Sequence, residues 1–363
     1  MQNLKINSDY LNVFREPLFF FKTLFIKRNK KQKTLGRILI VNTCLIGEFA
    51  ASLPAMSYFI QKSKVEVDLI VSPPLKELAQ RINGIKNVFI SKSVYSRIGE
   101  KAFLKNKQFR DYDTIFFMRM SNDAYSMLKE VKTREVKTSY TVFSKYGFYL
   151  FKNLLMKKYP KRWADVNFEM FGEKSHRINF DKIFDFKKKD FSTIEKFSAL
   201  KTKEQIVIIH TGASWIMNQW GKDKWAKAIN QINKIGKYRF IFVGGNREKE
   251  DFDYISQKLD FKIYSLIGKI GLKDLMILIK KANYFIGIDS GPANMARLAD
   301  TRSLVILGPG PHMYLPENPK DIVLDKSNGR GLYQRFFHKK NGFIDKITPD
   351  EVFTAFKKLQ GKN

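Results

Sequence analysis

The chain has 363 residues, of which 44% are hydrophobic and 28% charged, so its length predicts two globular domains of moderate size. Its 66 lysines and arginines against 35 acidic residues give a net charge of +31. This indicates an anionic partner: a phosphorylated substrate, an anionic membrane surface or nucleic acid. The single cysteine, Cys44, excludes an intrachain disulfide and a zinc site of several thiolates, and it favours a reducing compartment.

The first 36 residues form a basic, aromatic segment. Phe14, Leu18, Phe21 and Phe25 recur at helical spacing, and the run KRNKKQK (27–33) follows. This pattern is typical of a helix on an anionic membrane surface, and a helix packed on the protein's own core is the alternative. No stretch reaches the roughly 20 apolar residues that span a bilayer, and no signal-peptide cleavage site follows. We therefore expect a cytoplasmic protein.

Strand-like and helix-like segments alternate through the rest of the chain, which predicts the α/β class with parallel sheets. In the first half, the pattern predicts strands at 37–42, 67–71, 87–91 and 113–120, and helices at 49–61, 73–82 and 161–173. In the second half, it predicts strands at 205–210, 238–245, 263–268, 284–291 and 302–310, and helices at 221–234, 247–259, 271–282, 291–300 and 348–360.

These elements group into domains around a polar, highly charged stretch that begins near Asp181. The boundaries we expect are an N-terminal segment at 1–36, an N-terminal domain at 37–185, a linker at 186–204, a C-terminal domain at 205–347, and a last helix at 348–363. Thr348 and Glu351 predict a capping box at the start of that helix. We expect the helix to pack back on the N-terminal domain.

Polar loops follow several expected strands, at the sheet edge where open α/β sheets bind ligands. Asp289-Ser290-Gly291 lies between a strand and a helix, where free N–H groups and the helix dipole favour an anion. The alternative is simple capping of the helix by Asp289 or Ser290. HTGASW (210–215) repeats the arrangement with Thr211, Gly212, Ala213 and Ser214.

FVGGNRE (242–248) is a third such loop, which contains Gly244 as a further donor-binding candidate and in which Glu248 can accept hydrogen bonds from sugar hydroxyls. Three polar loops in one domain describe a nucleotide-diphosphate site better than three separate helix caps do.

LIGE (45–48) is the corresponding loop of the first domain. Glu48 follows a glycine at a strand–helix junction, where a carboxylate could act as a general base. The alternative is a first-turn glutamate that stabilises the helix dipole.

Other signatures are missing. No Walker sequence occurs, and GPGPHM does not match the dinucleotide pattern. Asp111 and Asp113 form a D-x-D, but it precedes a strand, at the wrong end of the sheet for a ligand-binding metal site. The four histidines, His176, His210, His312 and His338, show no metal-ligand spacing.

Taken in order, these loops resemble the heptosyltransferase family of glycosyltransferases, bacterial enzymes that extend the lipopolysaccharide core. The stretches that carry the resemblance are RILIVNTCLIGEFAASLP, IIHTGASWIMNQWGKDKW, FVGGNRE, LIGKIGLKDLMILIKKANYFIGIDSGPANMA and LVILGPGPHMYLPENP. The resemblance implies the GT-B architecture, with an N-terminal acceptor domain and a C-terminal nucleotide-sugar domain, both Rossmann-like, facing across a cleft. It also implies an inverting transfer, most often from ADP-heptose, without a metal ion or other cofactor.

The resemblance assigns roles residue by residue. Glu48 stands where the family usually has an aspartate as the catalytic base. Thr211, Gly212, Ala213 and Ser214 match the loop on the donor phosphates, and Asp289, Ser290 and Gly291 match the family's D-[ST]-G.

Besides Glu48, two further positions depart from the family pattern. Asn218 stands where a lysine often precedes a tryptophan, so Lys222 or Lys224 would have to supply that charge. Asn294 stands where the family has a histidine.

The partners that follow are a nucleotide-sugar donor, a phosphorylated glycolipid acceptor and the anionic inner-membrane surface, with no nucleic acid. The rival hypotheses are a catalytically inactive sugar- or membrane-binding protein on the same scaffold, and a nucleic-acid binder that the charge alone supports.

Overall fold

The computed structural model describes residues 36–91, 112–118, 133–138, 163–213, 218–308, 318–327 and 342–361. The chain divides into two compact units. The first comprises Met1–Cys44, Ala55–Lys152 and Asp165–His176, and the second comprises Leu45–Pro54, Asn153–Ala164 and Arg177–Asn363. The proposed N-terminal membrane helix falls outside the described residues. No helix in the described ranges is both long and apolar enough to cross a membrane.

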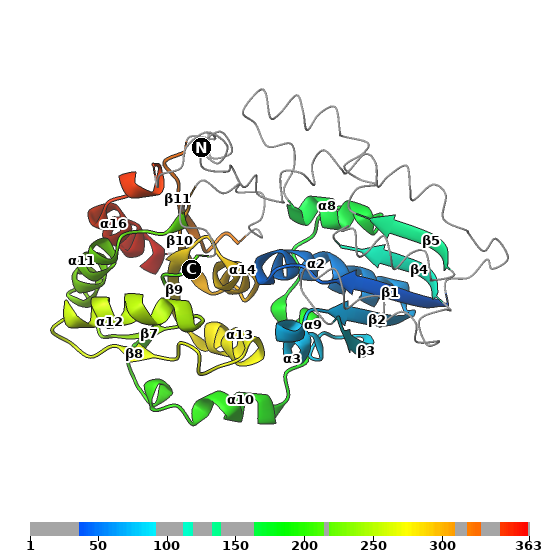
Figure 1. Cartoon of the computed structure of the whole chain (residues 1–363), viewed down its shortest axis with the longest axis horizontal. Helices are drawn as coiled ribbons and strands as arrows, with labels where there is room; N and C mark the ends of the chain where they lie inside the picture. The colour runs from blue at the N-terminus through cyan, green and yellow to red at the C-terminus, as the bar shows by residue number, and fades with distance from the viewer. Residues whose placement is uncertain are drawn as a thin grey trace, which may run out of the picture. The chain divides into compact units, whose positions relative to one another are not determined.

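The first unit is built on a parallel five-stranded sheet of order β3-β2-β1-β4-β5 (Figure 1). The strands are β1 (Arg37–Asn42), β2 (Glu66–Val71), β3 (Ile85–Ile90), β4 (Tyr112–Phe117) and β5 (Thr133–Thr138). β1 is almost entirely buried, because its run RILIVN has apolar side chains on both faces, as a strand covered on both sides requires. β5 lies in an aromatic and basic stretch for which no strand was predicted from the sequence.

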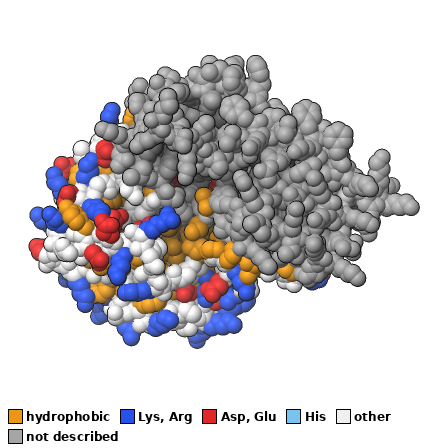
Figure 2. Space-filling model, viewed as in Figure 1, with side chains coloured by type: hydrophobic (Ala, Val, Ile, Leu, Met, Phe, Trp, Pro, Cys, Tyr) orange, Lys and Arg blue, Asp and Glu red, His pale blue; other side chains and the backbone are white. Residues whose placement is uncertain are grey.

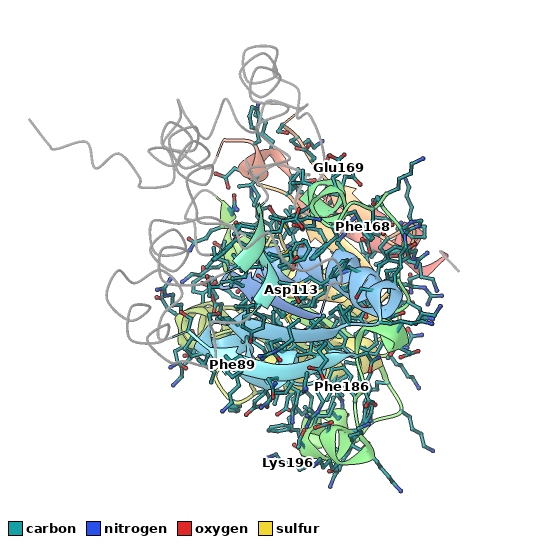
Figure 3. All side chains as sticks on the ribbon, turned by 90° about the vertical axis from the view of Figure 1, so that its right-hand side faces the viewer. Phe89, Asp113, Phe168, Glu169, Phe186 and Lys196 are labelled. Carbon is teal, nitrogen blue, oxygen red and sulfur yellow. The ribbon has the colours of Figure 1, made fainter. Side chains whose placement is uncertain are left out.

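Helices connect these strands. They are α2 (Ile46–Ser63), the short 3-10 turn η1 (Pro73–Leu75), α3 (Lys76–Ala79) and α8 (Trp163–Met170). Phe168 and Glu169 are neighbours on α8 (Figure 3), and the buried Phe168 ring lies 6.1 Å from the ring of Tyr58 on α2. Aromatic pairs of this kind fix α8 against α2.

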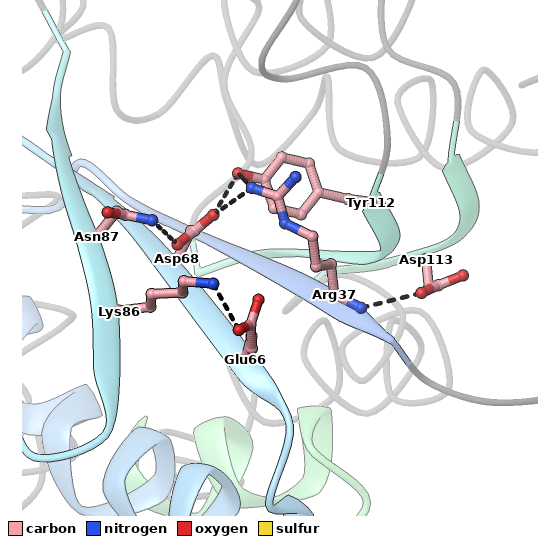
Figure 4. A network of polar contacts seen from close by, with 7 residues as sticks. All are labelled: Arg37, Glu66, Asp68, Lys86, Asn87, Tyr112 and Asp113. Carbon is pink, nitrogen blue, oxygen red and sulfur yellow. Dashed lines mark hydrogen bonds and ion pairs between the residues drawn. The ribbon is translucent and has the colours of Figure 1, made fainter.

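A polar network stands at the amino-terminal edge of this sheet (Figure 4). The buried Asp68 carboxylate accepts hydrogen bonds from Arg37 Nη2 at 2.8 Å, Tyr112 OH at 2.7 Å and Asn87 Nδ2 at 2.9 Å. Burial and the bond to Asp68 raise the pKa of Tyr112. Asp113 accepts the backbone N–H groups of Gly36 and Arg37 at 2.8 and 2.9 Å, so this carboxylate of the D-x-D ties two strands together.

The second unit contains a parallel six-stranded sheet of order β11-β10-β9-β6-β7-β8. The strands are β6 (Gln205–His210), β7 (Tyr238–Phe242), β8 (Tyr264–Ser265), β9 (Tyr284–Ile288), β10 (Arg302–Ile306) and β11 (Ile322–Leu324). Read from β8, this is the 3-2-1-4-5-6 order of dinucleotide-binding folds, with the switch point between β6 and β9. The expected strands are confirmed, and β11 is an addition.

The helices of this unit are α11 (Lys222–Asn233), α12 (Lys249–Gln257), α13 (Leu272–Lys281), α14 (Gly291–Leu298) and α16 (Pro349–Gln360). α16 starts with the expected capping box, since Thr348 Oγ1 accepts Glu351 N–H and Glu351 Oε2 accepts Thr348 N–H. Its Val352, Phe356 and Leu359 belong to the core of the second unit. Its apolar face is buried against α11 and β10, and a contact of this helix with the N-terminal domain stays a prediction.

The charged stretch after 181 also differs from the featureless linker suggested by its composition. It forms α9 (Phe180–Ile183) and α10 (Lys188–Glu195), and α10 packs on α13. The buried Asp190 carboxylate caps α10 through the Lys187 N–H at 2.8 Å and lies 3.4 Å from Lys273 Nζ. The ion pair makes a charged helix compatible with burial. On the visible described face, basic and acidic side chains are interspersed (Figure 2).

Candidate functional site

The three polar loops that follow β6, β7 and β9 lie at one edge of the second sheet. β10, β9, β6 and β7 are consecutive neighbours and run parallel, so their carboxyl ends lie side by side. The loops after β6 and β9 flank the switch point, which is where doubly wound folds bind nucleotides. This is the edge at which the sequence predicted the donor site, and the site itself stays a prediction.

His210, the last residue of β6, joins the two central loops. Its Nδ1 lies 3.2 Å from Ser290 Oγ, in the loop after β9. The imidazole is only 6% exposed, and this burial lowers the pKa of His210 to about 4. The ring is therefore neutral at physiological pH and carries one N–H donor and one acceptor nitrogen.

Ser290 begins α14 as its N-cap. Its Oγ accepts the Ala293 N–H at 3.5 Å, so the capping role that was weighed for this residue is present. Asn294 is buried and donates from Nδ2 to the Ser290 carbonyl at 3.0 Å. Its Oδ1 has no hydrogen-bond partner among the described residues. In the first turn of α14, Pro292 has no N–H and Ser290 accepts the N–H groups of Ala293 and Asn294, so the Gly291 N–H is the one left for a ligand, beside the buried acceptor of Asn294.

Asp289 and Gly291 flank this serine. The Asp289 N–H is held by the Ile306 carbonyl of β10 at 3.1 Å, which fixes the start of the loop. Gly291 must be a glycine because a Cβ there would lie 2.8 Å from Ile46 Cγ2. Ile46 belongs to Leu45–Pro54, the segment that groups with the second unit.

Glu248 lies across two glycine backbones. A Cβ on Gly212 would lie 1.9 Å from Glu248 Oε1, and one on Gly244 would lie 2.8 Å from Oε2. Gly244 also has φ +151°, which other residues rarely adopt. Burial raises the pKa of Glu248. The two glycines therefore make room for one half-buried carboxylate between the β6 and β7 loops.

Thr211 and Lys222 meet at a shared acid. Thr211 Oγ1 donates to Asp251 Oδ2 at 3.0 Å, and Lys222 Nζ lies 3.4 Å from Asp251 Oδ1 and 2.6 Å from Glu250 Oε1. The hydrogen bond to Glu250 raises the pKa of Lys222. The ammonium that was expected to replace the missing family lysine is thus already paired with two carboxylates.

Lys224, the other candidate for that charge, donates to the Asp345 carbonyl at 2.6 Å, away from these loops. Asn218 packs against Gly308, two residues after the end of β10. A Cβ on Gly308 would lie 2.4 Å from Asn218 Oδ1. Ala213 packs against the core of the second unit. Ser214 lies outside the described residues.

Glu48 lies within α2, in its first turn. The sequence suggested a loop up to residue 48, but the helix starts at Ile46, and Glu48 Oε2 accepts the Leu45 N–H at 3.3 Å. The helix starts early because this carboxylate caps its own first turn. Glu48 as a catalytic base stays a prediction.

Sequence reasoning missed two residues of this site. His210 was considered only as a metal ligand, although its place at the end of β6 beside the predicted phosphate loop was a usable signal. Asp251 has no such signal, because its link to Thr211 spans 40 residues and depends on how α12 packs. Among the described residues, no group of three or more His, Cys, Asp or Glu is placed to hold a metal ion.

These features define an α/β protein with two parallel sheets, one of which carries polar loops at the edge where doubly wound folds bind nucleotides. The family model for glycosyltransferase family 9 (heptosyltransferase) matches residues 107–328, and the chain belongs to that family. The fold class expected from the resemblance, GT-B with Rossmann-like domains, is confirmed.

Several known proteins are similar to this chain. The lipopolysaccharide heptosyltransferase 3 of Escherichia coli K12 is 26% identical over 172 residues, which cover 45% of this chain and 49% of that protein. The chain thus spans about half the length of the curated relative it matches.

Two crystal structures share the fold. A family 9 glycosyltransferase from Veillonella parvula DSM 2008 has a TM-score of 0.73 at 13% identity, covering 91% of this chain and 99% of that one. The E. coli heptosyltransferase WaaC with ADP-2-deoxy-2-fluoro heptose has a TM-score of 0.64 at 15% identity, covering 89% and 99%.

Proposed function

We propose that this protein transfers a heptose from ADP-heptose to a lipopolysaccharide core or related phosphorylated glycolipid, with inversion at the anomeric carbon. The observation that carries the proposal is the pairing of two different groups at one sheet edge. Glu248 offers an acceptor for ribose hydroxyls after β7, and Ser290 with the N-terminus of α14 offers donors for a diphosphate after β9. β6 separates these two strands, so the strands themselves stand about 10 Å apart.

Family membership supports the reaction, and the relative crystallised with an ADP-heptose analogue supports the donor. In this proposal, Thr211, Gly212 and Ala213 line the donor diphosphate together with Ser290 and Gly291. Backbone N–H groups stabilise the charge that develops on the leaving diphosphate. We expect turnover to need no divalent cation, so it should persist in excess EDTA.

We further propose Glu48 as the base that takes the proton from the acceptor hydroxyl as this attacks the anomeric carbon. Glu48→Gln is the sharp test, since the glutamine carbonyl can still accept the Leu45 N–H and keep the helix start intact. Turnover should fall at least a hundredfold while ADP binding stays within about twofold. Full activity in this variant would remove Glu48 from the mechanism.

The site of action proposed is the cytoplasmic face of the inner membrane. The net charge of +31 supports it, because anionic lipid attracts basic segments. Co-sedimentation with vesicles containing phosphatidylglycerol should be strong at low salt and weak at high salt. Equal binding to neutral vesicles would refute an electrostatic contact.

The first experiment is a panel of nucleotide sugars, with ADP-heptose beside UDP-, GDP- and CMP-linked sugars, scored by thermal stabilisation. A ligand that binds only the folded state raises the apparent Tm. ADP-heptose should stabilise the wild type and not Glu248→Ala. Asp253→Ala, which removes an exposed acid from α12, is the matched control. Stabilisation by none of the donors would favour an inactive binding protein on this scaffold.

A further inference from the structure

His210 is the buried titratable group that the proposed reaction leaves without a task. Its ring lies under the switch point, in contact with Ser290, and it makes this contact through Nδ1 alone at 3.2 Å. A neutral imidazole can make this bond in two ways: Nδ1–H can donate to Ser290 Oγ, or a bare Nδ1 can accept the serine proton. The two tautomers differ in whether the Ser290 hydroxyl proton is available to a ligand.

The hydrogen bonds of Ser290 distinguish them. A hydroxyl has two lone pairs and one proton, and one lone pair of Ser290 Oγ already accepts the Ala293 N–H. If Nδ1–H donates to the second lone pair, the serine proton has no acceptor among the residues that the structure describes and is available to a ligand. If Nδ1 is the acceptor, that proton is used inside the protein.

A second feature points to a ligand at this place. The amide of Asn294 is bound to the Ser290 carbonyl, and its Oδ1 is buried without a partner in the described part of the chain. An unpartnered acceptor is costly unless a hydrogen-bond donor such as a ligand hydroxyl meets it. Asn294 adjoins Ser290 through its bond to the Ser290 carbonyl, so its Oδ1 calls for a sugar or ribose hydroxyl of the ligand and not for the phosphate itself.

We propose that His210 is a positioning residue that donates from Nδ1–H to Ser290 Oγ and thereby turns the Ser290 hydroxyl into a pure hydrogen-bond donor for a phosphate oxygen of the nucleoside diphosphate. This inference rests on the proposed function. It adds a residue that sets the direction of the hydrogen bond between Ser290 and the diphosphate. His210 does not itself touch the ligand. It acts through Ser290.

The tautomer can be observed directly. The chain has four histidines, so a ¹⁵N-histidine NMR spectrum of the wild type is simple, and the His210 signals are assigned by their loss in His210→Asn. We expect His210 to carry its proton on Nδ1 at pH 7. A proton on Nε2, in the free protein and with ADP, would overturn the proposal without any variant having to fold.

Binding of ADP to the full chain supplies the functional test. The amide nitrogen of His210→Asn can stand near the Nδ1 position, whereas His210→Gln places its amide near Nε2, so the two variants form a matched pair. We expect His210→Gln and Ser290→Ala each to weaken ADP binding about tenfold, and His210→Asn to stay within about threefold of the wild type. The double variant should bind no worse than Ser290→Ala alone, because both changes remove one interaction.

The possible outcomes distinguish a failure of the proposed role of His210 from a failure of the proposed function. If the wild type binds ADP and His210→Gln binds it equally well, or if the two single losses add in the double variant, the role of His210 is refuted and the proposed function stands. If the wild type binds no nucleoside diphosphate, the proposed function and this inference fall together. A merely structural role would lower Tm in both His210 variants without coupling to Ser290.

Discussion

The buried His210 makes the stability of the second unit depend on pH in a calculable way. Burial lowers the pKa of this histidine from 6.5 to about 4. The unfolded chain therefore binds the proton more tightly than the folded one. Stability that is present at pH 7 is lost as the pH falls from 6.5 towards 4.

The size of the effect follows from these two pKa values. At pH 5 the unfolded histidine is almost fully protonated and the folded one is almost neutral. Integrating proton binding between pH 7 and pH 5 gives a loss of about 2 kcal/mol from this group. This loss is large enough to measure against a typical domain stability of about 5–15 kcal/mol.

Urea unfolding at pH 7, 6 and 5 tests this value. Tryptophan fluorescence is a suitable probe, because Trp220 and Trp225 are buried in the core of the second unit. His210→Asn has no titrating group at this position and should lose about 2 kcal/mol less than the wild type between pH 7 and pH 5. His176→Asn, which removes an exposed histidine of the first unit, is the control. Equal losses in wild type and His210→Asn would refute a buried, neutral His210.

Three further predictions follow from individual contacts. Gly212→Ala puts a Cβ where Glu248 Oε1 lies, so the carboxylate must move; titration calorimetry should show ADP binding at least tenfold weaker, and unchanged affinity would contradict the role of Glu248. Asp68→Ala removes the shared acceptor of Arg37 and Tyr112, and urea unfolding at pH 7 should show the first unit destabilised by about 3 kcal/mol. A loss below about 1 kcal/mol would mean that water replaces the carboxylate. Thr348→Ala breaks the capping box of α16 and should cost about 1 kcal/mol, with Thr354→Ala inside the same helix as the control.

Much of the fold could be predicted from local patterns. β1 and β6 have the bounds that their apolar runs predicted, and α16 begins at the predicted capping box. Local signals suffice in these cases because burial on both faces leaves a continuous apolar run, and because a cap involves residues only three positions apart.

Elements that depend on distant partners were harder to predict. The charged run of α10 looked like a linker because its buried Asp190 is compensated by Lys273, 83 residues away. The packing of α16 on α11 and β10 could not be predicted for a similar reason: an apolar helix face shows that a helix is buried and does not show against which elements.

The features of the candidate site also divide into those with a local sequence signal and those that depend on distant partners. The sequence by itself determined which loops carry the small and hydroxylated residues, because strand ends and helix starts are local features. Only the tertiary structure decided that His210 meets Ser290, that Asp251 joins Thr211 to Lys222, and that Glu248 lies over Gly212. These contacts arise from the order of strands in the sheet, which brings together loops that lie 36 to 80 residues apart. Strand order is fixed by packing over the whole domain, and no short stretch of sequence encodes it.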